Sequence, residues 1–170
     1  MQLKLNREFA ARHLFVAALM AAMGGWFAYD GYVKYPSMTP EALYASCHNG
    51  AQAASPEAAR RFRESAIPRQ KQFMALCFAA SVVVGLGVLR AARFRFSYDG
   101  DGFDFGGRRQ SLDDITGVDA SRWEKKGILK LSTKGGAVTL DAWHHAGVDG
   151  FYEILEAAGR VPAKQGRERK

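Results

Sequence analysis

This 170-residue sequence has few of the residues from which recognisable chemical sites are built. It contains two cysteines, Cys47 and Cys77, and neither belongs to a CxxC or CxxCH pattern. A disulfide framework, a zinc site and covalent haem attachment therefore lack their ligands. No nucleophile motif, phosphate-binding glycine loop or dinucleotide fingerprint occurs either. These absences favour a non-enzymatic protein with no catalytic residues, no cofactor and no metal.

Charged residues are missing from one long stretch, Phe73–Leu89, which reads FMALCFAASVVVGLGVL. As a helix its 17 residues would cover roughly 26 Å, enough for a membrane core once flanking residues are included. The alternative is a buried element of a soluble core, because Val82–Val84 favours strands while Gly85 and Gly87 weaken helices. An apolar strand of this length would far exceed the usual 5 or 6 residues. We therefore predict a transmembrane helix at residues 73–92.

A second uncharged run, Leu14–Tyr29, follows three basic residues near the N-terminus. Such a pattern describes either a signal peptide or a retained anchor. The run is long for a signal peptide and ends in Trp and Tyr, which are typical of a membrane interface. We predict that residues 1–33 form a basic segment and a retained transmembrane helix at about His13–Val33, ended by Pro36.

The stretch between the two runs, residues 34–72, contains two similar helix starts. Each places a capping Thr or Ser before a proline and a glutamate, which predicts short helices at Pro40–Ser46 and Pro56–Ser65. The second helix is basic, and its arginines would either contact anionic lipid headgroups or form a solvated face. These arginines are Arg60, Arg61 and Arg63.

The formal charge of +7 is unevenly distributed. Residues 1–92 carry ten Lys or Arg against five Asp or Glu, whereas residues 93–159 carry nine against eleven. The rest of the excess lies in residues 160–170, which we predict to be a basic disordered tail. This placement favours contact with anionic lipid over nucleic-acid binding. The basic residues that flank the runs slightly favour a topology with both termini in the cytoplasm.

After Arg90 the apolar residues alternate with polar ones, which predicts strands. The sequence Asp99-Gly100-Asp101-Gly102 is typical of a hairpin turn, and the alternation continues beyond it. Further strands are expected at Ile115–Ala120, Ile128–Ser132 and Ala137–Leu140. A helix is expected at Val148–Ala158, because its apolar residues recur at helical spacing.

This pattern of YDGDGFDF, SLDDITGVDA, KGILKLSTKGGAVTL and a final helix resembles a bacterial pleckstrin-homology-like domain behind a two-span membrane hairpin. The resemblance covers residues 93–159. It implies an α+β membrane protein in which a small antiparallel sheet or partial barrel, capped by a C-terminal helix, serves as a scaffold for lipids, peptides or membrane proteins. Phosphoinositide-binding members carry basic residues at the first hairpin, where this chain has Asp99 and Asp101. Nearby Arg93 and Arg95, with Arg108 and Arg109, are the candidates for headgroup contact.

Three other groups of side chains invite a chemical role. Asp99, Asp101 and Asp104 suggest calcium, but the loop departs from the EF-hand pattern and a turn explains the same residues. The pair His144-His145 has no cysteine or third histidine nearby, although Asp141 and Asp149 could approach it. A metal or acid–base role is the alternative to a loop that leads into the final helix, which is the expected structure. Asp30, at the end of the first run, would serve a proton pathway, pair with a basic group or mark the water interface.

The leading hypothesis is a multi-pass protein of the bacterial inner membrane, a non-enzymatic anchor that presents the pleckstrin-homology-like module for protein or lipid contact. Its expected partners are membrane lipids and other membrane proteins, without nucleic acid, and homo-oligomers remain open. An accessory subunit of a larger membrane complex is the second hypothesis. The third is an enzyme or transporter component that uses Asp30, His144 and His145.

Overall fold

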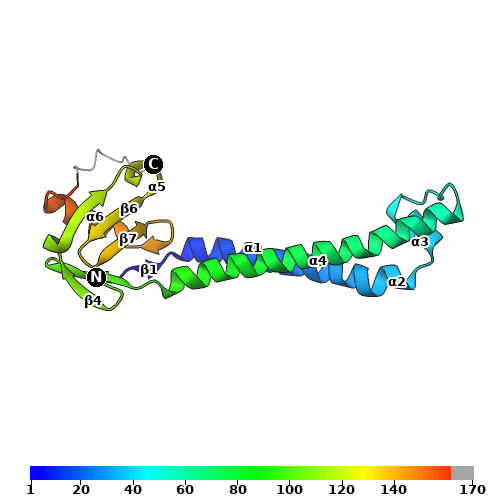
Figure 1. Cartoon of the computed structure of the whole chain (residues 1–170), viewed down its shortest axis with the longest axis horizontal. Helices are drawn as coiled ribbons and strands as arrows, with labels where there is room; N and C mark the ends of the chain where they lie inside the picture. Colours follow the sequence, from blue (N-terminus) through cyan, green and yellow to red (C-terminus); the bar gives the residue numbers. More distant parts are fainter. Residues whose placement is uncertain (162–170) are drawn as a thin grey trace. The chain divides into compact units, whose positions relative to one another are not determined.

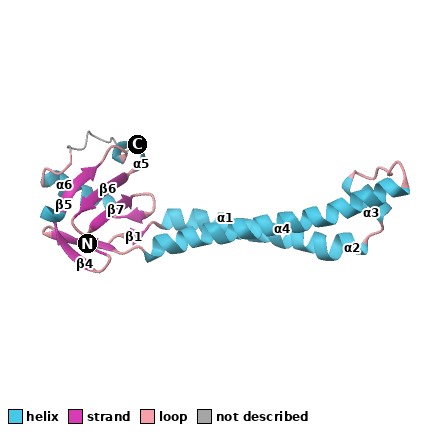
Figure 2. Ribbon diagram, viewed as in Figure 1, coloured by secondary structure: helices cyan, strands magenta, loops and turns pink. Residues whose placement is uncertain are grey.

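The computed structural model describes residues 1–161, so most of the predicted tail at 160–170 lies outside the described residues. The chain forms two compact units. The β unit contains Met1–Arg12 and the chain from Val88 onward, and the helical hairpin contains His13–Gly87. Helices and strands are coloured separately in Figure 2.

In chain order the elements are β1 (Lys4–Leu5), α1 (Arg7–Tyr29), the π-helix η1 (Asp30–Lys34), α2 (Tyr35–Ser37), α3 (Pro40–Cys47), α4 (Pro56–Arg93), β2 (Phe96–Tyr98), β3 (Gly102–Phe105), β4 (Arg108–Ser111), the 3₁₀-helix η2 (Leu112–Asp114), β5 (Ile115–Asp119), α5 (Trp123–Lys126), β6 (Ile128–Thr133), β7 (Gly136–Asp141), β8 (His145–Ala146) and α6 (Val148–Ala157).

The first helical run continues through α1, η1 and α2, so the prediction that Pro36 ends it was wrong. The π-helical turn explains the difference. The Tyr35 N–H donates to the carbonyl of Asp30, five residues back, and Pro36 then occupies the first turn of α2, where its missing N–H costs little. The run ends at Ser37, because Met38 has extended backbone angles.

The prediction of two separate helices at Pro56–Ser65 and 73–92 was also wrong, because α4 is one continuous 38-residue helix. It begins at Pro56 as predicted, and Ser55 caps it by accepting a hydrogen bond from the Ala58 N–H at 3.2 Å. Pro68 in its interior removes a helical hydrogen bond and costs about 3 kcal/mol. Packing offsets this cost, because Ala66 lies in a small core with Tyr35 and Leu43. Leu43 belongs to α3, so the same core fixes that helix. The predicted start of α3 at Pro40 is confirmed.

Within the helical hairpin, α1 and α4 run antiparallel and side by side (Figure 1). The Ser81 hydroxyl donates to the Ala17 carbonyl at 2.9 Å, and the rings of Phe27 and Phe73 lie 5.5 Å apart. In η1, which follows α1, a Cβ on Gly31 would lie 3.2 Å from the Gln70 side chain. This register aligns the two uncharged runs along their whole length.

Both helical runs are long and apolar enough to cross a membrane by length and composition. A buried core helix of a soluble protein would satisfy the same criterion. Here, however, only 22% of the most apolar window of the first run and 6% of that of the second are buried. Most of the apolar surface of the two helices is therefore exposed and does not pack within the hairpin. Its largest exposed side chains include Leu14, Phe15, Leu19, Trp26, Tyr29, Leu76, Val82, Val83 and Leu86.

Two adjacent glycines provide a test of the helix pairing. A Cβ on Gly24 would lie 3.1 Å from the Phe78 ring, whereas a Cβ on Gly25 would meet nothing within 4 Å. We expect Gly24→Leu to destabilise the hairpin by about 1–3 kcal/mol through overpacking. The matched control Gly25→Leu should not destabilise it. Thermal unfolding of the detergent-solubilised chain measures both, and equal effects of the two changes would contradict the packing described here.

The β unit contains two three-stranded antiparallel sheets, in the orders β2-β3-β4 and β5-β6-β7. The predicted hairpin at residues 99–102 is confirmed, since Tyr98 pairs with Phe103 across it. The predicted strands at residues 115–120, 128–132 and 137–140 correspond to β5, β6 and β7. Strand β4 was not predicted, because it reads RRQS and buries only Gln110. The α+β class with small antiparallel sheets is therefore confirmed.

Aromatic side chains from the first sheet and from α6 form the centre of the β-unit core. Phe96 stacks on Phe103 at 5.5 Å, and Phe151 of α6 lies edge-on to Phe96 at 5.0 Å. A second stack joins Trp123 of α5 to Tyr152 of α6, with ring centroids 4.5 Å apart. The predicted C-terminal helix is thus confirmed as the amphipathic element that closes this core.

The N-terminus completes the β unit, which the sequence did not predict. Strand β1 pairs antiparallel with β8, and the Leu3 N–H donates to the Phe96 carbonyl at 2.9 Å. The Tyr98 N–H donates to the Met1 carbonyl at 2.7 Å, and Leu3 is only 4% exposed. The predicted basic segment before the first helix is therefore part of the β unit.

Candidate functional site

The helical hairpin contains a groove of about 500 Å³ between α3 and α4. Most of its lining comes from one face of α4, because the contributing residues are three, four, seven and eight positions apart. Basic, acidic and apolar groups all contribute. The lining residues are Pro40, Arg60, Arg63, Glu64, Ile67 and Pro68.

The three predicted lipid-contact arginines of this segment have different environments. Arg63 donates from its guanidinium to the Pro36 carbonyl at 2.9 Å, and within residues 1–161 its buried Nε has no hydrogen-bond acceptor. Arg60 is exposed at the groove. Arg61 does not line the groove and pairs with Glu57 at 2.5 Å. The structure therefore brings Arg60 and Arg63 together but separates Arg61 from them.

The other two predicted contacts, Arg93 and Arg95, lie where α4 leads into β2. Arg93 is the last residue of α4, and both side chains are exposed. Neither forms an ion pair within the described part of the chain. Their guanidinium groups are therefore available to external anions.

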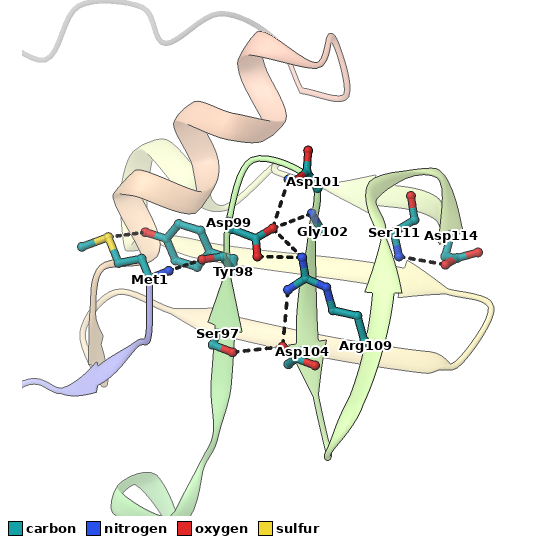
Figure 3. A network of polar contacts seen from close by, with 10 residues as sticks. All are labelled: Met1, Ser97, Tyr98, Asp99, Asp101, Gly102, Asp104, Arg109, Ser111 and Asp114. Atoms are coloured by element: carbon teal, nitrogen blue, oxygen red, sulfur yellow. Dashed lines mark hydrogen bonds and ion pairs between the residues drawn. The ribbon is translucent and has the colours of Figure 1, made fainter.

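The first hairpin holds a network of polar contacts around Arg109 (Figure 3). Arg109 contacts both carboxylate oxygens of Asp99, at 2.5 and 2.6 Å, and reaches Asp104 at 3.4 Å. Asp99 also accepts hydrogen bonds from the backbone N–H groups of Asp101 and Gly102, each at 3.0 Å. The Arg109 hydrogen bond, followed by that from Asp101, lowers the pKa of Asp99 to about 2. Arg109, on β4, is thus engaged by the carboxylates of the first hairpin and adds little to a basic patch.

The Arg109–Asp99 pair predicts a pH dependence. Because the folded pKa of Asp99 is lowered from 3.8 to about 2, the pair stabilises the hairpin above pH 4 and loses this effect as the pH falls toward 2. We expect Arg109→Gln to raise the pKa of Asp99 toward its ordinary value, as followed by NMR titration of its carboxyl carbon. The neighbouring exposed Arg108 provides the control, Arg108→Gln. A pKa of Asp99 unchanged by Arg109→Gln would contradict this cause.

Each side chain considered for catalysis has a structural contact. His145 is 7% exposed and its Nε2 lies 3.0 Å from the Ala91 carbonyl, while His144 Nδ1 lies 3.2 Å from Asp141. Asp30 is buried in η1, 3.9 Å from the Lys34 ammonium group. The histidines belong to the β unit and Asp30 to the helical hairpin. Within residues 1–161 no group of three His, Cys, Asp or Glu side chains is arranged to hold a metal.

Sequence reasoning missed Trp143, which is 40% exposed. The Arg12 guanidinium lies over its indole ring at 5.5 Å, and Phe9 packs edge-on against it at 6.3 Å. No sequence signal identified Trp143, because its contact partners Phe9 and Arg12 lie more than 130 residues earlier in the chain.

Comparisons with protein-family models, curated proteins and solved structures found no match to this chain.

Proposed function

We propose that this chain is a two-span protein of the bacterial inner membrane that holds a pleckstrin-homology-like β unit at the cytoplasmic surface. In this role it is a non-enzymatic anchor, and the β unit contacts lipids or other membrane proteins. Two small antiparallel sheets closed by a C-terminal amphipathic helix are compatible with such a module.

The observation that carries this proposal is the register of the helical hairpin. It aligns two uncharged runs whose apolar side chains face outward, and α4 has little buried surface in its most apolar window. In water such a surface would be strongly unfavourable, at roughly 25 cal/mol per Å² of exposed apolar area. A lipid bilayer removes that cost, and helices satisfy their backbone hydrogen bonds there.

The N-terminal strand supports the proposed topology. Residues on either side of the two helices pair with each other in one sheet, since β1 precedes α1 and β8 follows α4. If both helices cross the bilayer, this pairing requires the two flanking segments to lie on the same side. An even number of crossings meets that requirement.

The continuous helix α4 also bears on where lipid contacts occur. Arg63 precedes Phe73 by ten residues and Arg60 by thirteen, which corresponds to roughly 15 and 20 Å along a helix. The polar interface of a bilayer is only about 5–8 Å thick on each side. We therefore assign headgroup contact to Arg93 and Arg95, and propose that Arg60 and Arg63 lie beyond the interface on an upright α4.

A role as an accessory subunit is the second candidate. It is favoured by three glycines on the outward face of the helices, Gly25, Gly85 and Gly87, where an added Cβ would meet nothing within 4 Å. Small residues at such positions allow close approach of another transmembrane helix. Recovery of one partner in constant proportion after detergent purification would favour this role over a free-standing anchor.

Thiol labelling in intact bacterial cells tests the proposal. In a Cys77→Ala variant, the exposed Cys47 reports on the segment between the two uncharged runs, residues 34–72. In a variant without both native cysteines, Ala137→Cys reports on the β unit. We expect an impermeant maleimide applied from outside to label Cys47 alone. The position in the β unit should react only after the cells are permeabilised.

The other outcomes each have a definite meaning. Labelling of Ala137→Cys but not Cys47 in intact cells would invert the topology. Recovery of the protein in the soluble fraction without detergent would overturn the membrane proposal itself.

A further inference from the structure

The loop between β7 and β8 contacts the beginning of α1 through its exposed tryptophan. Arg12 is the last charged residue before the uncharged run, and its guanidinium lies over the Trp143 ring at 5.5 Å. Phe9, one helical turn earlier and 4% exposed, packs on both Trp143 and His144. The Asn6 N–H also donates to the His144 carbonyl at 2.8 Å. Trp143 is thus held beside Arg12, which precedes the first uncharged run by two residues in the chain.

Strand β8, which follows this loop directly, contacts the end of α4. His145 Nε2 lies 3.0 Å from the carbonyl of Ala91, two residues beyond the second uncharged run. The His145 ring also packs against Phe94 at 4.7 Å. All these residues belong to the β unit, so the segment from Trp143 to His145 contacts both the beginning of α1 and the end of α4.

The β7–β8 loop provides an amphipathic ring, and the end of α4 that His145 contacts provides basic groups. Arg90 and Arg93 lie in the last turn of α4, are exposed, and form no ion pair within residues 1–161. Indole rings concentrate at the headgroup level of bilayers, where one edge is apolar and the other is wet. Basic residues near the surface attract anionic lipid.

We propose that Trp143, together with Arg90 and Arg93, is a binding surface for anionic phospholipid headgroups that holds the β unit against the bilayer. Arg12, which pairs with Glu8, positions the Trp143 ring. Trp143 inserts at the depth of the glycerol backbone, and the arginines bind the phosphates above it. This inference rests on the proposed membrane insertion of the two helices. The proposed ligand is a lipid headgroup in a bilayer and not a soluble anion.

The three tryptophans of the chain make the test direct, because their environments differ. Trp26 is 67% exposed within an uncharged run, Trp123 is 1% exposed in the β-unit core, and Trp143 lies on the proposed surface. The full chain is reconstituted into phosphatidylcholine–phosphatidylglycerol vesicles containing lipid brominated either near the glycerol or near the bilayer centre. Emission is compared for Trp26→Phe, Trp143→Phe and the variant with both changes.

The double variant retains only Trp123 and should be quenched by neither lipid. Subtracting its emission from that of Trp26→Phe isolates Trp143, which we expect to lose intensity mainly with the shallow bromines. Replacing phosphatidylglycerol by phosphatidylcholine, or combining Arg90→Gln with Arg93→Gln, should reduce this loss. The matched pair Lys125→Gln and Lys126→Gln on α5 should not.

Two negative results are distinguishable. If Trp26 is quenched but Trp143 is not, the headgroup surface is overturned while membrane insertion stands. If neither is quenched, the proposed function fails. Shallow quenching of Trp143 that is indifferent to anionic lipid and to both arginines would also overturn the assignment of these arginines.

Discussion

Replacing Leu3 with alanine is expected to destabilise the β unit by about 2–5 kcal/mol, although Leu3 lies more than 90 residues from β2 in the chain. Leu3 is 4% exposed and belongs to the same core as Phe96 and Phe151. Truncating it leaves a cavity where the N-terminal strand closes the domain. The backbone bonds from β1 to β8 remain, so the effect isolates side-chain packing.

Amide hydrogen exchange measures this effect without requiring complete unfolding. Exchange of the protected amides in β2 and α6 should accelerate about 30-fold or more, which is the factor for 2 kcal/mol. Lys4→Ala is the matched control, because Lys4 is the next residue in the chain and its side chain is exposed. If Leu3→Ala and Lys4→Ala exchange alike, the N-terminus does not belong to the core of the β unit.

Introducing a charge on the outward face of α4 should have the second large effect. Val83 is 68% exposed and lies inside the uncharged run. On a water-exposed helix, Val83→Arg would change stability by only about 0.5 kcal/mol. At the centre of a membrane span, an arginine raises the free energy of insertion by about 3 kcal/mol. The same substitution therefore separates a membrane helix from an exposed helix of a soluble protein.

The ratio of inserted to non-inserted chains for this segment provides the measurement. We expect Val83→Arg to lower it by about two orders of magnitude, the factor for 3 kcal/mol. Gln72→Arg, at the exposed edge of the same run, should leave the ratio nearly unchanged. An unaffected ratio for Val83→Arg would mean that this face of α4 does not contact lipid.

Among the candidate site residues, sequence reasoning identified the basic segments but not how their members are used. The structure engages Arg61 with Glu57 and Arg109 with Asp99, whereas Arg93 keeps an exposed guanidinium. Spacing along one helix suggests the first pair, because residues four apart are neighbours. The second pair joins the turn after β2 to β4, so it depends on the register of the sheet.

The sequence by itself determined the features that depend on neighbouring residues. These include the two uncharged runs, the caps at Thr39 and Ser55, the hairpin turn after Tyr98 and the amphipathic α6. Each arises from turn chemistry, capping or periodicity within a few residues, and such local preferences can be read without knowing the partner surface.

Only the tertiary structure decided which distant segments pair. Strand β1 pairs with β8, about 140 residues later in the chain, and Trp143 contacts Arg12. Tertiary packing allows α4 to continue through Pro68. A two-residue strand has too little pattern to reveal its partner, and a proline breaks a helix unless tertiary contacts offset its cost. The energy that selects these arrangements comes from surfaces buried between residues far apart in the chain, so it appears only when the β unit closes and the two helices pack.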